Sequence, residues 1–270
     1  MIKLFNRTNT RVSCLGNHDL DFGIKEMVDL TNQTSPCIWL ISNMYVAGEP
    51  VGNLKRYHVE EHNGIKIGYM GIAEQEWLGQ LSPVIVEKIE YEDYIKTASD
   101  LAKMLREEHG CQLIVCLSHM RLPRDKILAA SVKEIDLILG GHDHMYAVEL
   151  NQDTGVFIVK SGTDFEDFSD IRLEFGTSPT ELLPDDKNYH LYSAQKKMTM
   201  HCQRVRITDR FKPDPEIEQH VEFYSADLNK KLLEVCGHTE CDIEARFEKI
   251  RHEETNLANW ICDVIRTEFE

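Results

Sequence analysis

Three polar segments of the sequence each follow a short apolar run and carry side chains that can bind metal ions or move protons. They are Gly-Asn-His-Asp at residues 16–19, Ser-His at residues 118–119 and Gly-Gly-His-Asp-His at residues 140–144. Imidazole nitrogens and amide oxygens are good ligands for Zn, Mn, Fe or Co. Two such ions about 3.5–4 Å apart can bind phosphate oxygens and hold a hydroxide in line with the scissile bond. The segments therefore predict metal-assisted hydrolysis of a phosphoester.

The predicted metal ligands supply one amide oxygen and three imidazole nitrogens. They are Asn17, His119, His142 and His144. His18 adjoins Asn17 in the sequence but points elsewhere, so it is available to stabilise the transition state or to protonate the leaving alkoxide. Asp21, three residues after His18, can orient the imidazole. We therefore expect His18 and Asp21 to form the catalytic pair.

Each segment has a simpler interpretation when it is considered alone. An Asn-His pair after a strand is more often a turn with a surface imidazole than a ligand. Ser-His at a strand end, as at residues 118–119, is common. Two imidazoles on one extended segment, as in residues 142–144, are harder to explain without a metal. Because all three segments occur in one chain with a strand and helix between them, we interpret them as one site.

The segments follow apolar runs at residues 12–15, 113–117 and 135–139, each of which predicts a buried strand that delivers polar residues at its carboxyl end. Residues 94–109 have helical spacing and stop at Gly110, which can cap a helix. Other strands are predicted at residues 38–41, 56–59, 65–70, 156–160 and 170–175, and another helix at residues 23–32. The pattern predicts an α/β fold with ligand groups at the carboxyl ends of its strands.

The composition changes after about residue 176. Residues 177–188 are polar and contain two prolines, and a long acidic helical stretch follows from Lys212 to about Leu233. A capped amphipathic segment then begins at Glu253. We therefore predict a partial core domain at residues 1–176, a linker with a long helix at residues 177–245, and the start of another domain at residues 246–270.

The composition also limits the kind of partner. The chain has 270 residues, 42% of them hydrophobic, and a formal net charge of −16, which opposes binding to nucleic acid. No apolar run is long enough to span a bilayer, and the apolar stretch within residues 1–6 is too short for a secretory signal. The sequence as written predicts a cytoplasmic location, or export if the N-terminus is truncated. The eight cysteines lack Cys-x-x-Cys spacing and are interpreted as reduced thiols.

The motifs resemble those of the calcineurin-like metallophosphoesterases, and specifically of their 5′-nucleotidase branch. Residues 16–23 are similar to the branch's Gly-Asn-His-Glu/Asp-Phe-Asp-x-Gly signature, and residues 140–144 to its Gly-Gly-His-x-His box. Residues 254–263 look like the opening helix of its C-terminal nucleotide-recognition domain. The resemblance implies a four-layer αββα sandwich with a dinuclear metal site, followed by a linker helix and the first helix of that C-terminal domain.

The resemblance also implies how the metals are shared. Asn17, His119 and His142 would bind one ion, and His144 would bind the other. In the family, an Asp-x-His and a Gly-Asp segment precede the Gly-Asn-His-Asp box and supply the carboxylate that bridges the metals. The sequence reaches Gly16 too soon for either segment. We therefore expect a chain truncated at both ends, without its N-terminal strands, and one metal ion in place of two.

Hypotheses from two classes remain open. The first is an enzyme in which a metal-bound hydroxide attacks the phosphorus of a nucleoside monophosphate or a related phosphoester. The alternative is a catalytically inactive fragment or regulatory isoform that retains part of the fold and at most one metal site. A weaker variant of the enzyme hypothesis changes the substrate to a cyclic nucleotide or nucleotide sugar. In the enzyme hypotheses the partner is a small-molecule phosphoester or nucleotide.

Overall fold

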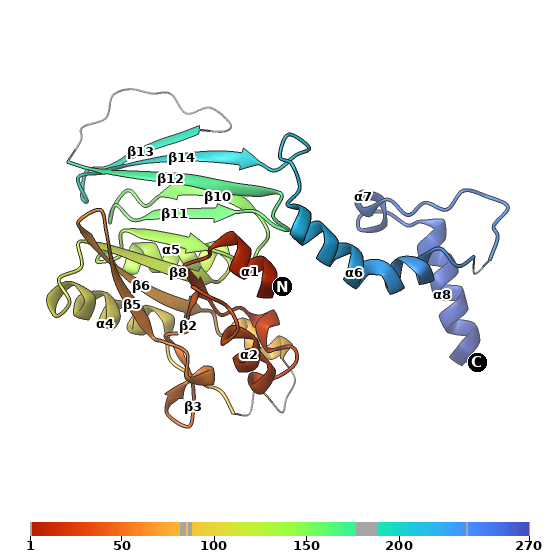
Figure 1. Ribbon diagram of the computed structural model, residues 1–270, viewed down its shortest axis with the longest axis horizontal. Helices are drawn as coiled ribbons and strands as arrows, with labels where there is room; N and C mark the ends of the chain where they lie inside the picture. Colours follow the sequence, from red (N-terminus) through yellow and green to blue (C-terminus); the bar gives the residue numbers. More distant parts are fainter. Residues whose placement is uncertain (1, 82–84, 86–87, 177–187, 236, 270) are drawn as a thin grey trace. The chain divides into compact units, whose positions relative to one another are not determined.

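The computed structural model in Figure 1 describes residues 2–81, 85, 88–176, 188–235 and 237–269. Contacts between residues divide the chain into two compact units, Met1–Lys212 and Pro213–Glu270. All of the segments predicted to carry chemistry lie in the first unit.

The main sheet of the first unit has six strands in the order β10-β11-β9-β8-β6-β5. The four inner strands are parallel, whereas the two edge strands are antiparallel to their neighbours. Because parallel strands end at the same edge, Ser118 lies opposite Gly140, and Ala73 lies opposite His119. The strands are β5 (Tyr57–His62), β6 (Ile65–Ala73), β8 (Leu113–His119), β9 (Leu137–Gly140), β10 (Tyr146–Leu150) and β11 (Phe157–Ser161).

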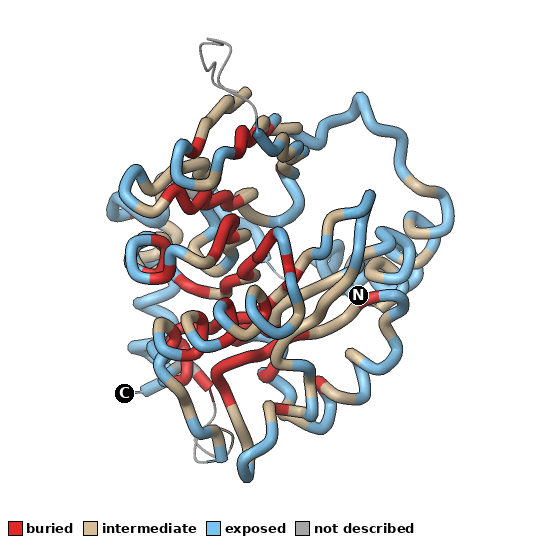
Figure 2. Tube along the Cα trace, turned by 90° about the vertical axis from the view of Figure 1, so that its left-hand side faces the viewer, coloured by how far each residue is buried: buried red, intermediate tan, exposed pale blue. Residues whose placement is uncertain are grey.

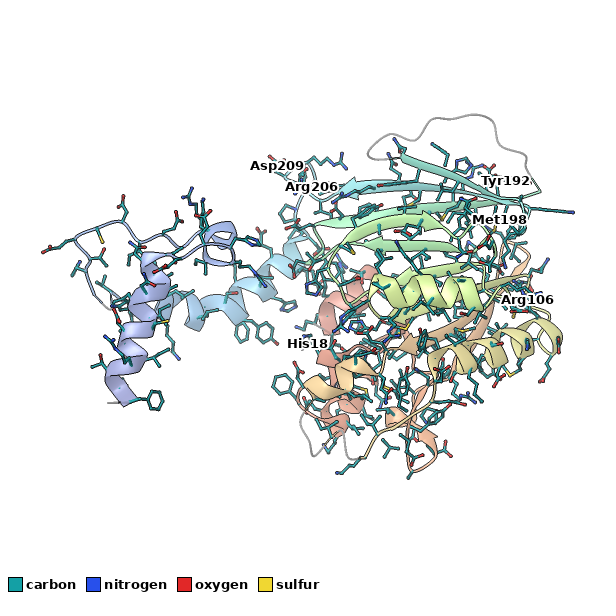
Figure 3. The ribbon with its side chains drawn as sticks, turned by 180° about the vertical axis from the view of Figure 1, so that it is seen from behind. His18, Arg106, Tyr192, Met198, Arg206 and Asp209 are labelled. Atoms are coloured by element: carbon teal, nitrogen blue, oxygen red, sulfur yellow. The ribbon has the colours of Figure 1, made fainter. Side chains whose placement is uncertain are left out.

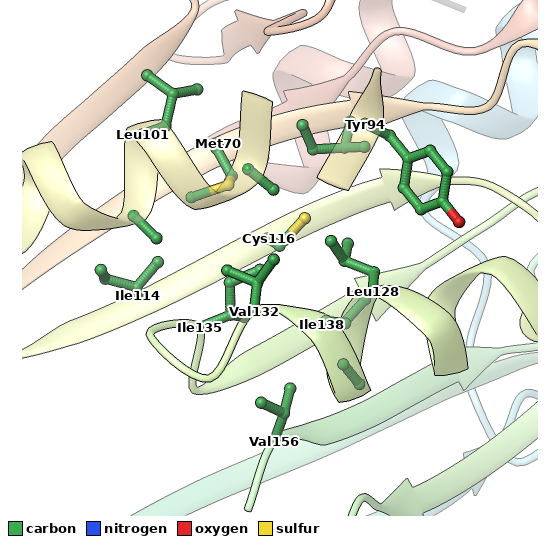
Figure 4. Packing of buried hydrophobic residues seen from close by; sticks show 14 of the residues in the cluster. Met70, Tyr94, Leu101, Ile114, Cys116, Leu128, Val132, Ile135, Ile138 and Val156 are labelled. Carbon is green, nitrogen blue, oxygen red and sulfur yellow. The ribbon is translucent and has the colours of Figure 1, made fainter. Parts of the chain in front are cut away.

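Two helices cover one face of this sheet. Helix α4 (Tyr94–Glu107) is capped at its N-terminus by Asp93, whose carboxylate accepts a hydrogen bond from the Lys96 amide, and helix α5 (Leu122–Ser131) begins after Arg121. Their apolar sides pack on the alternate strand residues that face them, as Figure 4 shows for Leu101 and Leu128. This packing buries the larger of the clusters that hold β8 and β9 in place.

A second sheet packs on the other face. It is antiparallel, in the order β12-β14-β13, with β12 (Asp167–Phe175), β13 (Asn188–Ser193) and β14 (Met198–Arg206). Phe157 and Val159 from β11 are buried against Met200 and Cys202 from β14. Helices, main sheet and second sheet thus give three of the four expected layers among the described residues. The predicted α/β fold is confirmed.

The N-terminal part of the first unit adds smaller elements around the site. Strands β1 (Val12–Cys14) and β2 (Ile38–Leu40) form a parallel pair, and α2 (Ile24–Thr31) packs beside them on the cluster around Met27 and Trp77. A small sheet has the order β4-β3-β7. The other elements are α1 (Ile2–Thr8), β3 (Met44–Val46), β4 (Glu49–Pro50), β7 (Glu90–Tyr91) and three short 3₁₀ helices, η1 (Asn17–Leu20), η2 (Val51–Asn53) and η3 (Glu76–Gln80).

The first unit continues beyond the predicted core boundary. The sequence predicted a linker from residue 177, but β13 and β14 pair with β12, and the unit extends to Lys212. These strands pack one face on the main sheet and leave the other face half-exposed. Apolar residues such as Tyr189 and Leu191 therefore alternate with polar ones, and the segment as a whole has the polar composition of a linker. Residues 177–187 of the predicted linker lie outside the described residues.

The second unit consists of helices. They are α6 (Pro215–Leu232), α7 (Phe247–Ile250) and α8 (Asn256–Phe269), and the first and last match the two predicted helices. The Asn256 side chain accepts a hydrogen bond from the Glu244 amide and donates one to the Asp242 carbonyl, which fixes the start of α8. Figure 2 shows buried residues along the strands and helices of the first unit, whereas α8 buries none of its side chains. No helix in the described part of the chain is long and apolar enough to cross a membrane.

Candidate metal centre

The site lies at the edge where the parallel strands of the main sheet end. His119 is the last residue of β8, and residues 141–144 follow directly after β9. The Gly141 amide donates a hydrogen bond to the Ser118 carbonyl at 2.8 Å, which keeps the two strand ends together. Asn17 opens η1, and its side chain is buried among these ends.

Three of the four predicted ligands meet at this edge. Nε2 of His119 lies 2.9 Å from Oδ1 of Asn17 and 3.2 Å from Nδ1 of His142. The planes of the two imidazole rings are inclined by 67°, and the ring centroids lie 5.0 Å apart. Three different segments of the chain therefore direct one oxygen and two nitrogens to a common point.

This donor set fits one divalent ion. Ligand atoms bound at about 2.0–2.2 Å to one ion lie roughly 3 Å apart, and Nε2 of His119 lies at such distances from the donor atoms of Asn17 and His142. Among the described residues, no group of three or more His, Cys, Asp or Glu side chains is arranged to hold a metal ion. The candidate site therefore depends on the amide oxygen of Asn17. Asn17, His119 and His142 supply three ligands, and none of the three is a carboxylate.

Gly16 allows His119 to reach Asn17. A Cβ atom at Gly16 would lie 2.8 Å from Cε1 of the His119 ring, closer than the two atoms can approach. The backbone carbonyl of His119 accepts a hydrogen bond from the buried indole of Trp77 at 3.2 Å. The ring position is therefore set by the absence of a side chain at Gly16 and by the packing of Trp77.

His18 and Asp21, which the sequence predicts as the catalytic pair, lie in contact with each other. Nδ1 of His18 lies 2.9 Å from Oδ2 of Asp21, the residue that directly follows η1, and the two side chains are 83% and 49% exposed. His18 therefore stands at the surface next to the buried Asn17, where its imidazole can meet a ligand arriving from solvent. Figure 3 shows His18 on the opposite side of the first unit from Arg106 and Met198.

His144 is the predicted ligand that the structure does not bring to the common point. Its side chain is exposed and makes no hydrogen bond or ion pair with another described residue. Its backbone has φ of 49°, and that of His142 has φ of 80°, both in the left-handed region that favours glycine. Backbone conformations of this kind cost free energy and are concentrated at functional sites.

The surroundings keep the two central imidazoles neutral. Burial lowers the pKa of His119 to about 4, and the charges of His142 and Lys160 act in the same direction. Burial also lowers the pKa of His142, although the nearby Glu74 carboxylate opposes the shift. Since only a neutral imidazole has a lone pair for a metal, both residues are in the binding form at neutral pH.

Glu74 is part of the site but was not predicted from the sequence. Its carboxylate is 1% exposed, and Oε1 lies 2.6 Å from Nη1 of Arg121 and 3.5 Å from Nε2 of His142. The position of Glu74 could have identified it as a site residue. Glu74 directly follows β6, and the last residue of β6 lies opposite His119. The predicted strand ended at residue 70, which placed Glu74 in a loop.

Lys160 lies beneath the ligand loops. Its ammonium group is buried and donates hydrogen bonds to the carbonyls of Met120 at 2.8 Å and Gly141 at 2.5 Å. It also forms ion pairs with Asp125 at 2.9 Å and Asp143 at 2.7 Å. The Lys160 ammonium group therefore links Met120, which follows His119, to Gly141 and Asp143, which flank His142.

Two of the cavities lined by described residues of the first unit lie in different places. One, of about 330 Å³, is lined by His119, Ser118, Gly140 and Gly141 together with Cys14, and it opens beside the ligand group. The other, of about 500 Å³, is lined by residues that include Arg106 and Met198, so it is remote from His18 (Figure 3). Of these two cavities, the first adjoins the candidate metal centre.

Comparison with protein families gives a match over more than half of the chain. A family model described as calcineurin-like phosphoesterase matches residues 1–146, which include all of the predicted ligands and the pair His18 and Asp21. An apyrase from Tabanus yao is 30% identical over 94% of this chain and 46% of its own length. A 5′-nucleotidase from Diplobatis ommata is 24% identical over 93% of this chain and 44% of its own length.

Comparison with solved structures agrees on the fold. A 5′-nucleotidase precursor from Thermus thermophilus superimposes with a TM-score of 0.73 at 19% sequence identity, over 97% of this chain and 52% of that chain. At this identity the likeness shows a shared fold. The chain thus spans about half the length of the proteins in these three comparisons.

Proposed function

Because the chain belongs to the calcineurin-like phosphoesterase family, we propose that it carries the core of a metal-dependent phosphoester hydrolase of the 5′-nucleotidase type. Enzymes of this family are hydrolytic and generally metal-dependent. The proposed substrate is a nucleoside monophosphate or a related phosphoester. The names of the apyrase and the 5′-nucleotidase that it resembles support a nucleotide.

The observation that carries the proposal is the convergence of Asn17, His119 and His142. These residues come from three strand ends, and their donor atoms lie 2.9 and 3.2 Å apart. Together they would hold one divalent ion, which when bound supplies Lewis-acid activation of the phosphate and of water. His144, at the end of the same loop as His142, is proposed as a ligand of a second ion.

The chain's own residues supply the proton transfer. His18 is exposed and directly follows the buried Asn17 in the sequence, so we expect its imidazole to reach a phosphoester bound at the ligand group. Asp21 holds Nδ1 of His18 at 2.9 Å, which leaves Nε2 for the leaving oxygen. A charged imidazole at that position stabilises the negative transition state and then donates its proton to the alkoxide.

The test combines metal content with hydrolysis. Purified protein is loaded with Mn²⁺ or Zn²⁺, its metal content is measured by mass spectrometry, and hydrolysis of AMP and of a chromogenic phosphomonoester is followed. We expect metal-dependent turnover that is lost, together with most of the bound metal, in His119→Ala. His62→Ala, an exposed histidine at the end of β5, is the matched control and should retain both.

A second candidate function is a non-catalytic protein that binds one metal ion. It is favoured by the donor set, since the described residues bring three ligands and no carboxylate to the common point. The same experiment separates the two functions. One bound ion per chain without hydrolysis of any phosphoester would favour the non-catalytic candidate, whereas turnover above that of His119→Ala would exclude it.

A further inference from the structure

We propose that Glu74 is a positioning residue of the metal centre. Its carboxylate accepts a hydrogen bond from Nε2–H of His142 and thereby leaves the Nδ1 lone pair of His142 directed toward His119 in the ligand group. The inference deepens the proposed function, because it takes these three residues as the ligand group. It assigns a role to a buried acid that the proton-transfer mechanism does not use.

The first observation is burial. The Glu74 carboxylate is 1% exposed, although an ionised carboxylate is costly to bury without compensating partners. It follows β6 at the edge where β8 ends, and Ala73 lies opposite His119 in the sheet. The sequence therefore places an acid at the level of the ligand group.

The second observation is that one oxygen of this carboxylate has an incomplete set of partners. Oε2 accepts a hydrogen bond from the Arg121 amide at 3.0 Å. Oε1 lies 2.6 Å from Nη1 of Arg121, yet it has no hydrogen bond of good geometry to any described residue. Since buried polar atoms are almost always hydrogen-bonded, Oε1 needs a donor.

The donor that faces Oε1 is His142. Its Nε2 lies 3.5 Å from Oε1, at the outer limit of a hydrogen bond, while its Nδ1 lies 3.2 Å from Nε2 of His119. The neighbouring Asp143 is already occupied by the Leu122 amide and by Lys160. A small rotation of the His142 ring would therefore complete the missing bond of Oε1.

This bond fixes the tautomer of His142. A neutral imidazole carries a proton on one nitrogen and a lone pair on the other, so a proton held on Nε2 leaves Nδ1 free to bind a metal. Ligand histidines are commonly oriented by a carboxylate on the second nitrogen, and loss of that partner weakens metal binding by about 10–100-fold. Arg121 in turn holds Glu74 through its amide and its guanidinium group.

A purely structural role for Glu74 makes a different prediction. If the acid serves only to neutralise Arg121, its removal lowers stability and leaves the His142 tautomer unchanged. The tautomer is therefore the decisive readout. It can be measured on the metal-free protein, so the result does not depend on catalytic activity.

The experiment is long-range ¹H–¹⁵N NMR of the histidine side chains at a pH where His142 is neutral, with the His142 signals assigned by their loss in His142→Gln. We expect the wild type to carry the proton on Nε2. Glu74→Leu should give a mixture of tautomers and bind Mn²⁺ about tenfold or more weakly by calorimetry. The control is Glu76→Gln, which removes a surface acid paired with Arg124 and should change neither property.

The outcomes distinguish this inference from the proposed function. A wild-type proton on Nδ1, or a Glu74→Leu protein that folds and retains both tautomer and Mn²⁺ affinity, would overturn the positioning role while leaving the hydrolase proposal intact. Failure of the wild type to bind any metal, with the proton on Nε2, would instead overturn the hydrolase proposal alone. If Glu74→Leu does not fold, Glu74→Gln replaces it, and the wild-type tautomer remains decisive.

Discussion

The amide oxygen of Asn17 lies 2.9 Å from Nε2 of His119, although 102 positions separate the two residues in the sequence. The first residue belongs to a 3₁₀ turn and the second to the end of an inner strand of the main sheet. Neither element alone supplies a complete set of ligands. The proposed ligand group therefore exists only when the N-terminal segment is packed on the sheet.

Replacement of Gly16 by alanine should damage the metal centre without unfolding the protein. The added Cβ would meet the His119 ring at 2.8 Å, so the ring must move away from Asn17. We expect Mn²⁺ affinity to fall by about tenfold or more, measured by calorimetry. Gly79→Ala, where a Cβ would meet nothing within 4 Å, should bind Mn²⁺ as the wild type does. Equal affinities for the two variants would contradict this account of His119.

Removal of the His18 imidazole should affect turnover more than metal binding. His18 contacts Asp21 and stands at the surface, outside the ligand group. In a preparation that hydrolyses phosphomonoesters, we expect His18→Ala to lower kcat by about 10²–10⁴-fold with normal metal content. Asp21→Asn should cause a smaller loss, because the imidazole remains. A His18→Ala protein that loses its metal would show that His18 is a ligand instead.

Replacement of Lys160 by methionine should destabilise the first unit severely. The change leaves Asp125 and Asp143 without their buried cation, and loss of one partner of a buried ion pair typically costs about 3–5 kcal/mol. Urea denaturation measures this change in the free energy of unfolding. The matched control is Lys126→Met, since Lys126 pairs with Glu149 where both side chains are exposed, and a change below about 1 kcal/mol is expected. Similar losses in both variants would refute a special role for Lys160.

The metal-free protein should lose stability as the pH falls from about 6.5 to about 4. Burial lowers the pKa of His119 to about 4, whereas an unfolded histidine titrates near 6.5. In this range the unfolded chain binds more protons, so acidification favours unfolding. We expect His119→Gln to flatten the pH dependence by up to about 1.4 kcal/mol per pH unit. Urea titrations with EDTA at pH values of about 5, 6 and 7 measure the two slopes.

The pH dependence of stability must be compared between the wild type and His119→Gln, because Asp125 changes stability with pH in the opposite direction from His119. Burial raises the pKa of Asp125 to about 6, so its ionisation reduces stability as the pH rises. Wild type and His119→Gln share this contribution, and it cancels in the difference. Identical slopes would show that His119 does not remain neutral in the folded state.

The strand-end segments could be predicted from the sequence because they are local. Apolar runs identify β8 and β9, and the polar residues that end them must lie at one edge of a parallel sheet. The helices α4, α6 and α8 follow from spacing and capping residues in the same way. These signals need no knowledge of distant contacts, which is why the positions of Asn17 and His119 were expected.

The parts that were missed depend on tertiary packing. Glu74 and Lys160 are charged residues in or next to strands, and nothing in their own segments shows that each is buried against partners from elsewhere in the chain. Strands β13 and β14 carry a polar composition because only one face packs on the main sheet. The positive φ of His142 likewise follows from the loop's surroundings.

The ammonium group of Lys160 has a dynamic consequence. It binds the carbonyls of Met120 and Gly141 at once, and Asp143, its partner, also holds the Leu122 amide at 2.6 Å. The two loops that carry His119 and His142 therefore cannot open one at a time without exposing a buried charge. Their amides should exchange with solvent through a single cooperative opening, so that release of an ion bound at the edge of the sheet is an all-or-none event.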